Sequence, residues 1–272
     1  MKFAGIIAEY DPFHNGHAWQ LAQTKALGAE RVAVAMSCSL VQRGALPLLP
    51  EAVRTRSALT CGADLVFALP APCACAGAEA FARAGVALLA AAGCDGLVFG
   101  AETPDAALLM EAAELLDSGS YRAALKAQLA GGARSFAAAR QAAAAQLASD
   151  ERVAALLDKP NNNLAVEYCR AIRSLAPRME AYPLPRQGAN HGEALHSAHG
   201  QFASASALRK LWAEGGADAV APYVPEAVFP LYQEAYAAGQ YTDFSAAGRC
   251  ELALLRSACR GKAPFADIRG VS

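Results

Sequence analysis

The chain has 272 residues, of which 54% are hydrophobic, so it can bury the core of one large domain or two modest ones. Its 24 basic and 25 acidic residues leave a formal net charge of -1, which excludes a global field that attracts polyanions. Any contact with a nucleic acid must therefore be local.

Hydropathy and cysteine usage predict a cytoplasmic protein. The apolar run at the N-terminus ends at Glu9, too early for a signal peptide, and no uncharged apolar stretch reaches the roughly 18 residues of a membrane span. Eight cysteines are scattered along the chain, with Cys73 and Cys75 as the only close pair. We therefore expect reduced thiols rather than disulfides or a zinc site.

Strand and helix patterns alternate along the first hundred residues. Continuous apolar runs that predict strands lie at 3–8, 31–36, 64–69 and 96–99. Helical patterns separate them, at 19–27, 52–61 and 78–91. Each strand is expected to be buried on both faces, as in a parallel sheet. The alternation predicts an α/β fold with a doubly wound parallel sheet.

The composition changes after residue 103. From 104 to 158, Ala, Leu, Gln, Glu and Arg recur at helical spacing, which predicts a helical insertion. We expect it to divide an α/β domain into two parts, 1–103 and 159–215. Residues 216–272 are predicted to form a helical C-terminal region.

The second part of the α/β domain contains further predicted elements. A helix at 164–175 leads to a strand at 179–184, and a loop with the three remaining histidines follows. A helix then opens near Ser204 and is expected to break at Gly215-Gly216. Turns are predicted at Gly239 and Gly248.

The segment His14-Asn15-Gly16-His17 stands between the first predicted strand and the first helix. Ligands of open parallel sheets bind beyond the carboxyl ends of the strands, and a helix N-terminus offers free N–H groups to a phosphate. Gly16 allows close approach of the backbone. A spacing of three places His14 and His17 on one helix face, where both can stabilise charge on an α-phosphate and a departing pyrophosphate. Surface histidines or a metal pair remain alternatives, although two histidines alone make an incomplete zinc site.

A second phosphate motif lies late in the chain, at 203–209. The hydroxyls of Ser204 and Ser206 and the exposed N–H groups of a helix start can bind phosphate oxygens, and Arg209 can neutralise the β and γ phosphates. The alternative is a capping serine followed by a surface arginine. Together with His14 and His17, this motif predicts adenylyl transfer from ATP, with Mg²⁺ expected but no protein ligand assigned to it.

Six motifs in order resemble the bacterial tRNA-Met cytidine acetate ligase family, whose members are HxGH nucleotidyltransferase-like. The first spans 5–17, where that family commonly has Asn at the position of Asp11. The others lie at 36–44, 62–70, 99–102, 159–162 and 203–209. The resemblance implies a Rossmann-like nucleotidyltransferase fold.

The resemblance also implies an activity, a ligase that uses ATP to activate acetate. Acetate would form acetyl-adenylate with release of pyrophosphate, and the acetyl group would pass to the exocyclic amine of the wobble cytidine of elongator tRNA-Met. The expected partners are therefore ATP, acetate and this tRNA, with no membrane.

By resemblance, the nucleotide contacts fall on the opening loop and on four later positions. In the loop they are Ile7, Ala8, Glu9, Tyr10, Pro12, Phe13, His14, Gly16, His17 and Gln20; the later ones are Gly100, Asn162, Arg186 and Gln187. Local alternatives stay open for three of these: Gly100 as a turn glycine, Asn162 as a helix cap and Arg186 as a solvated surface residue.

Two further assignments concern acetate and tRNA. Gln42 and Arg43 could orient acetate or a phosphate, or could simply lie on a loop surface. A local basic stretch, Arg249, Arg256, Arg260, Lys262 and Arg269, is the candidate tRNA contact, with a solvated charged face as the alternative.

Besides Asp11, the sequence departs from the family pattern at four positions. Cys38 and Ser39 stand where Gly and Asn are usual, Glu51 where Lys is expected, and Ala68 where an acidic residue is common. A reversed charge at Glu51 near a phosphate path would weaken binding. The family typically continues past the residues that end this chain at Ser272, so we expect a C-terminal truncation.

Three other functions compete with the ligase. A small-molecule adenylyltransferase of the pantetheine-phosphate or nicotinamide-mononucleotide type shares both phosphate motifs. A catalytically silent RNA-binding module would keep only the fold. A zinc hydrolase would need His191, His196 and His199, whose spacing is irregular.

Overall fold

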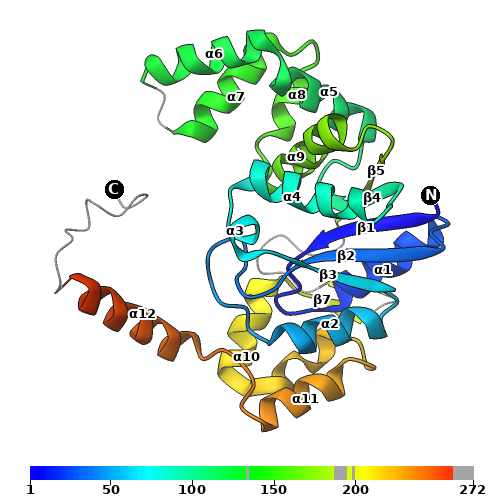
Figure 1. The fold of residues 1–272 in the computed structure, drawn as a ribbon, viewed down its shortest axis with the longest axis vertical. Coiled ribbons are helices and arrows are strands. Elements are labelled where there is room, and N and C mark those ends of the chain that lie inside the picture. The colour runs from blue at the N-terminus through cyan, green and yellow to red at the C-terminus, as the bar shows by residue number, and fades with distance from the viewer. Residues whose placement is uncertain (133–134, 187–194, 198–199, 260–272) are drawn as a thin grey trace.

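A parallel sheet organises the chain in the computed structural model, which describes residues 1–132, 135–186, 195–197 and 200–259. Its strands are β1 (Phe3–Ala8), β2 (Arg31–Ser37), β3 (Leu65–Leu69), β4 (Gly96–Ala101) and β5 (Glu180–Pro185). Their order is β3-β2-β1-β4-β5, all parallel (Figure 1). The chain thus reverses direction across the sheet between β1 and β4, which confirms the predicted doubly wound fold.

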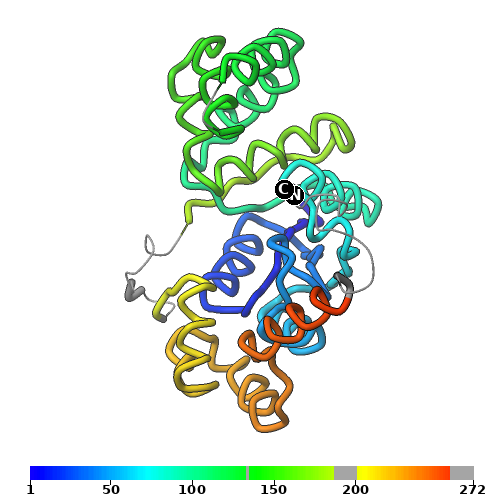
Figure 2. Tube along the Cα trace, turned by 90° about the vertical axis from the view of Figure 1, so that its left-hand side faces the viewer, coloured from blue at the N-terminus to red at the C-terminus, as the bar shows by residue number. Residues whose placement is uncertain are grey.

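Two groups of helices cover the two faces of the sheet (Figures 1 and 2). One group packs on β1 and β4 and continues into the helical region above the sheet: α3 (Ala71–Ala74), α4 (Ala78–Ala91), α5 (Ala106–Asp117), α6 (Gly119–Ala130), α7 (Phe136–Leu147), α8 (Glu151–Leu156) and α9 (Pro160–Leu175). The other face carries α1 (Asn15–Ala26), α2 (Glu51–Thr60), α10 (Ala205–Val220), η1 (Ala221–Tyr223) and α11 (Phe229–Ala237).

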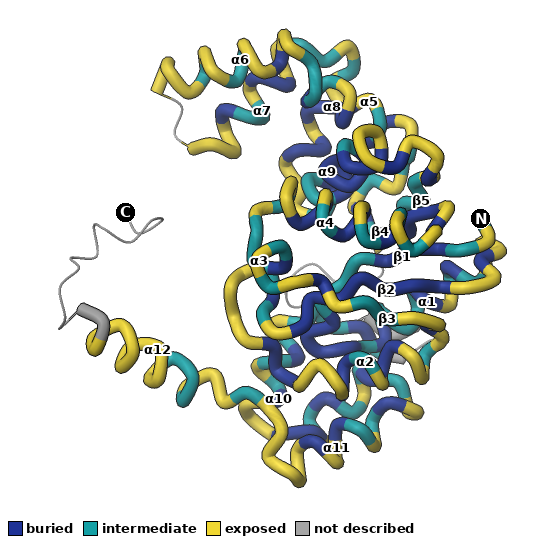
Figure 3. Tube along the Cα trace, viewed as in Figure 1, coloured by how far each residue is buried: buried dark blue, intermediate teal, exposed yellow. Residues whose placement is uncertain are grey.

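Alternation along β2 explains why there are two cores. Ala33 and Ala35 belong to the cluster with α4, α5 and α9, whereas Val32, Val34 and Met36 belong to the cluster with α1, α2 and α10. Successive side chains of a strand point to opposite faces, so a continuous apolar run is needed when both faces are covered. Burial follows this layering in Figure 3.

Several element predictions need correction. β3 is the edge strand of the sheet and is not buried on both faces, since Leu65 is 46% exposed. The expected turn at Gly248 is wrong, since this glycine lies inside α12 (Phe244–Cys259). Part of the expected loop forms a hairpin, β6 (Leu195–Ser197) with β7 (Gly200–Phe202).

Other predictions hold with shifted bounds. α9 begins at Pro160 rather than 164, because proline at the first helical position lacks only an N–H group that the helix does not use. The break at Gly215-Gly216 is confirmed, as Gly216 has φ of 67° within α10. Helices α5 to α8 fill the region predicted as an insertion. In the described ranges, no helix is long and apolar enough to cross a bilayer.

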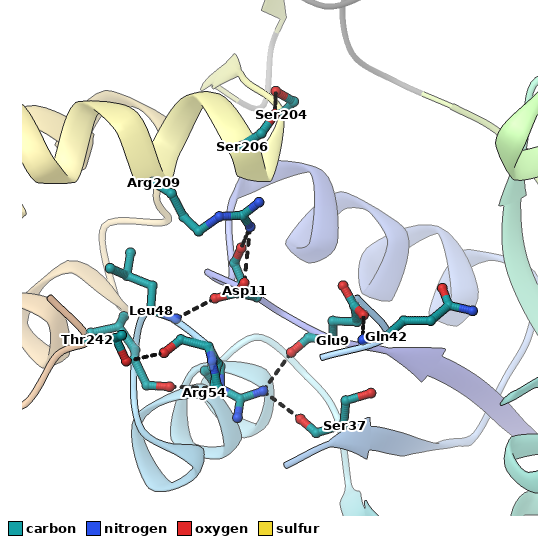
Figure 4. A network of polar contacts seen from close by, with 12 residues as sticks. Glu9, Asp11, Ser37, Gln42, Leu48, Arg54, Ser204, Ser206, Arg209 and Thr242 are labelled. Atoms are coloured by element: carbon teal, nitrogen blue, oxygen red, sulfur yellow. Dashed lines mark hydrogen bonds and ion pairs between the residues drawn. The ribbon is translucent and has the colours of Figure 1, made fainter. Parts of the chain in front are cut away.

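A buried arginine, Arg54 of α2, ties together the segments that surround the carboxyl ends of β1 and β2 (Figure 4). Its Nη1 donates to the carbonyl oxygens of Glu9 at 2.7 Å and Ser37 at 2.6 Å. Its Nη2 donates to Cys38 O, and its Nε donates to Leu49 O at 3.0 Å. One side chain that is fully shielded from water thus donates to four carbonyls of two segments, the loop after β1 and the connection from the end of β2 to α2.

Replacement of Arg54 by Met should destabilise the protein by at least about 3 kcal/mol, because buried carbonyl oxygens lose their donors. The measurement is the free energy of unfolding in urea. Arg56→Met is the matched control on the same helix, since its side chain is 61% exposed and pairs with Glu234 only at 3.6 Å. The control should change stability by less than about 1 kcal/mol. Equal effects of the two substitutions would contradict the role given to Arg54.

Candidate functional site

The two histidines of the opening motif form a reciprocal cap at the start of α1. Gly16 N donates to His14 Nδ1 at 3.0 Å, and His14 N donates to His17 Nδ1 at 3.2 Å. The two rings stack with their centroids 3.8 Å apart. His14 is therefore the cap itself rather than a residue of the helix, but both imidazoles still lie together at the carboxyl edge of the sheet.

This cap fixes which ring nitrogen faces a ligand. In a neutral imidazole one nitrogen accepts and the other carries the proton. Because both Nδ1 atoms accept backbone N–H groups, the proton of each neutral ring is assigned to Nε2. The site thus presents two fixed N–H donors, a suitable arrangement for phosphate oxygens.

Burial keeps both rings neutral near pH 7. It lowers the pKa of His14 from 6.5 to about 4, and the nearby charge of Arg186 acts in the same direction. The pKa of His17 is also well below its usual value, mainly through burial and then through His14 and Arg186. Before a nucleotide binds, the histidines therefore act as hydrogen-bond donors and not as cations.

Buried aromatic side chains that precede the histidine cap pack against it. Tyr10 is buried and packs edge-on against His17, with ring centroids 4.8 Å apart, and Phe13 is buried next to both. Tyr10 has φ of 51°, so the chain turns sharply as it leaves β1. A Cβ atom on Gly16 would lie 2.9 Å from the ring of His14, which explains the glycine there. Nucleotide contacts at Tyr10 and Phe13 would have to use the backbone.

The tertiary fold brings the second motif to the first (Figure 4). Ser204 caps α10, its Oγ accepting from Ala207 N at 3.3 Å, and lies 3.0 Å from the hydroxyl of Ser206. One turn further, Arg209 reaches the loop after β1 and donates to Asp11 O at 2.7 Å and to Asp11 Oδ2 at 3.0 Å. The loop that leads into α1 is therefore joined directly to the first turns of α10.

Glu9 and Gln42 also meet at the end of β1. Gln42 N donates to Glu9 Oε1 at 2.6 Å, which holds the loop with Arg43 over this edge of the sheet. Burial raises the pKa of Glu9, and the nearby charge of Asp11 adds to the effect. Gln42 and Arg43 remain predicted acetate or phosphate ligands.

The other predicted contacts surround the end of β4. Gly100 and Arg186 are neighbours, since a Cβ on Gly100 would lie 3.4 Å from Arg186 Cγ. Gln20 Nε2 donates to Val98 O at 3.3 Å, which fixes α1 to β4. Asn162 is 1% exposed, accepts from Thr103 N at 2.9 Å and donates to Thr103 Oγ1 at 3.2 Å. Its side chain thus joins α9 to the loop after β4, and its direct nucleotide contact stays a prediction.

Some predicted residues cannot be placed in this site. Gln187, His191 and His199 lie outside the described residues, as do three of the basic residues: Arg260, Lys262 and Arg269. His196 lies in β6, whose side chains the structure does not describe. Arg249 and Arg256 are exposed on α12, which extends away from the sheet in Figure 1. Among the described residues, no cluster of three His, Cys, Asp or Glu could hold a metal ion.

Two departures from the family pattern turn out to be neighbours. Cys38 is buried at the end of β2, where burial raises the pKa of its thiol to about 11 and a hydrogen bond to Glu51 adds to the shift. Glu51, at the start of α2, therefore lies close to Cys38, whose thiol donates to Met36 O at 3.2 Å. Ala68 lies exposed on the edge strand β3, and Ser39 is exposed in the loop after β2.

Sequence reasoning missed two residues that the structure places in or under the site. Arg54 occupies an ordinary helical pattern, and its buried partners are carbonyl groups that leave no mark in a sequence. Asp11 stands inside the first motif, but its pairing with Arg209 links positions 198 residues apart. No local pattern predicts either contact.

Comparisons with known proteins show the family and the fold. The sequence profile of the family described as HIGH Nucleotidyl Transferase matches residues 1–259. A tRNA(Met) cytidine acetate ligase of Syntrophotalea carbinolica is 41% identical over 79% of this chain and 52% of its own length. One of Caldanaerobacter subterraneus is 35% identical over 88% of this chain and 60% of its own. The chain thus spans a little over half the length of these relatives.

Two solved structures of a related protein share the fold of this chain. The crystal structure of Thermotoga maritima TmcAL bound with alpha-thio ATP superposes with a TM-score of 0.80 at 30% identity, over 89% of this chain and 57% of that one. Its apo form superposes with a TM-score of 0.81.

The neutral state of His14 predicts a pH dependence of stability. Its pKa is about 4 in the folded protein and 6.5 when unfolded, so the unfolded state binds more protons between these values and stability falls as the pH falls from 6.5 to 4. His14→Asn keeps a capping side chain without this titration. Urea unfolding at pH 7 and pH 4.5 should show a smaller loss for the variant than for the wild type. Equal losses would show that His14 titrates normally.

Proposed function

The chain belongs to the HIGH nucleotidyl transferase family, and from this premise we propose that it activates acetate with ATP and acetylates the wobble cytidine of elongator tRNA-Met. The observation that carries the proposal is the pair of neutral imidazoles fixed at the start of α1, in a loop that Arg209 of α10 contacts at Asp11. The relatives named tRNA(Met) cytidine acetate ligase support the choice of substrates. They favour it over a small-molecule adenylyltransferase.

In the first step, a carboxylate oxygen of acetate attacks the α-phosphorus of ATP, and the bond to the bridging oxygen of pyrophosphate breaks. Nε2–H groups of His14 and His17 donate to the α-phosphate and the departing pyrophosphate, where negative charge grows. Ser204, Ser206 and Arg209 hold the β and γ phosphates at the start of α10. Mg²⁺ is expected on the phosphate oxygens, and we assign it no protein ligand.

In the second step, the exocyclic amine of cytidine attacks the acetyl carbon of acetyl-adenylate. The bond between that carbon and the phosphate oxygen breaks, AMP leaves, and the amine loses a proton. Water would hydrolyse the mixed anhydride, so the site must exclude it. The buried Tyr10 and Phe13 make the floor of the loop apolar.

The remaining assignments follow the same proposal. Gln42 and Arg43 lie at the edge where acetate would approach, next to Glu9. Arg186 and Gly100 are neighbours and would contact the nucleoside. Arg249 and Arg256 are exposed on α12, where their charges would contact tRNA. A tRNA-modifying enzyme of this kind works in the cytoplasm.

Incubation with ATP, Mg²⁺ and acetate should yield acetyl-adenylate by mass spectrometry, with release of pyrophosphate. His14→Ala and His17→Ala should each lower the rate about 100-fold or more, because a fixed donor to the transition state is lost. Lys210→Ala is the control, since this side chain is 80% exposed and pairs only with Glu214 at 3.9 Å. Pyrophosphate release that requires a phosphorylated acceptor and ignores acetate would refute the ligase and favour an adenylyltransferase.

A further inference from the structure

Arg209, the cation of the second phosphate motif, is already engaged by a carboxylate. Its Nη1 lies 3.0 Å from Asp11 Oδ2 and 2.7 Å from the carbonyl oxygen of the same residue. Its side chain is only 28% exposed, and that of Asp11 is 5% exposed. A pair so shielded from water is screened less by salt than a surface pair.

Asp11 is held from the opposite side as well. Leu48 N donates to its Oδ1 at 2.6 Å, so the two carboxylate oxygens have separate partners (Figure 4). The carboxylate cannot turn away from Arg209 without breaking the bond to Leu48. Asp11 therefore fixes the position of the guanidinium from a rigid support.

The charge of Asp11 opposes the charge that Arg209 brings to the site. A triphosphate at the start of α10 would meet a guanidinium whose positive charge a carboxylate at hydrogen-bond distance largely offsets. Glu9 lies close enough to Asp11 for their charges to interact, which adds negative charge at this edge. Arg54 is also close enough for its charge to interact with that of Asp11, but its hydrogen bonds go to carbonyl oxygens.

We propose that Asp11 is a positioning residue that fixes Arg209 and, through its charge, weakens the hold of the site on the β and γ phosphates. The inference rests on the proposed function, because it takes Arg209 as the phosphate ligand. The weaker binding of the outer phosphates would serve product release. When pyrophosphate, the first product, leaves, Arg209 pairs again with Asp11 alone. The carboxylate thus favours product release at the expense of nucleotide affinity.

Asp11→Asn isolates the charge. The amide oxygen can still accept from Leu48 N, while the ion pair with Arg209 is lost. Calorimetric titration with α,β-methylene ATP and with pyrophosphate should give dissociation constants about tenfold lower than those of the wild type. The affinity for AMP, which lacks both outer phosphates, should not change. Inhibition by added pyrophosphate should become stronger to the same degree.

The double variant Asp11→Asn/Arg209→Ala is the decisive control. If Asp11 acts through Arg209, the gain in affinity disappears when Arg209 is absent. A gain that persists in the Arg209→Ala background, or unchanged affinity in a folded Asp11→Asn protein, would overturn the inference. Asp11→Ser, which is also neutral, repeats the test if Asn unfolds the loop.

The same titrations separate this inference from the proposed function. If the wild type binds α,β-methylene ATP and Asp11→Asn binds it no more tightly, only the role of Asp11 is refuted. Absence of binding to both proteins at millimolar nucleotide refutes both. Tighter binding without acetyl-adenylate formation by the wild type keeps the role of Asp11 in a nucleotide site of different chemistry.

Discussion

The geometry of the site depends on one buried guanidinium. Arg54 donates to carbonyl oxygens of the loop after β1 and of the connection from the end of β2 to α2. These loops leave the sheet where a ligand would bind, and without a common donor their carbonyl groups would be buried unpaired. The loop with Asp11 and the two histidines therefore starts from a fixed point.

The two histidines suit a phosphate because their N–H donors are held in fixed orientations, not because their rings are charged. Both imidazoles are neutral near pH 7 and have one proton-bearing nitrogen each, because the capping bonds occupy the other. Donors that are already oriented need no rearrangement when charge develops on a phosphate. In the proposed function, Arg209 of α10 supplies positive charge, and we propose that Asp11, its partner, limits how much of that charge a ligand meets.

Local patterns predicted most of the fold and the core of the site. Apolar runs placed β1, β2 and β4, and the strand-to-helix position of His14 and His17 pointed to a phosphate. The errors occurred where tertiary position outweighs local pattern. β3 reads like a central strand but lies at an edge, and Gly248 reads like a turn but continues a helix, because a glycine weakens a helix without always ending it.

The sequence alone predicted the doubly wound sheet, the position of the histidine pair between a strand and a helix, and the start of α10 at Ser204, because periodicity and helix starts are properties of neighbouring residues. It did not predict that His14 caps α1. Only the tertiary structure decided which distant groups meet. Arg54 is a buried donor to two separate segments, and Arg209 contacts Asp11 across 198 positions of sequence. Such contacts depend on how strands and helices pack, and the energy of a buried charge is set by its surroundings rather than by its place in the chain.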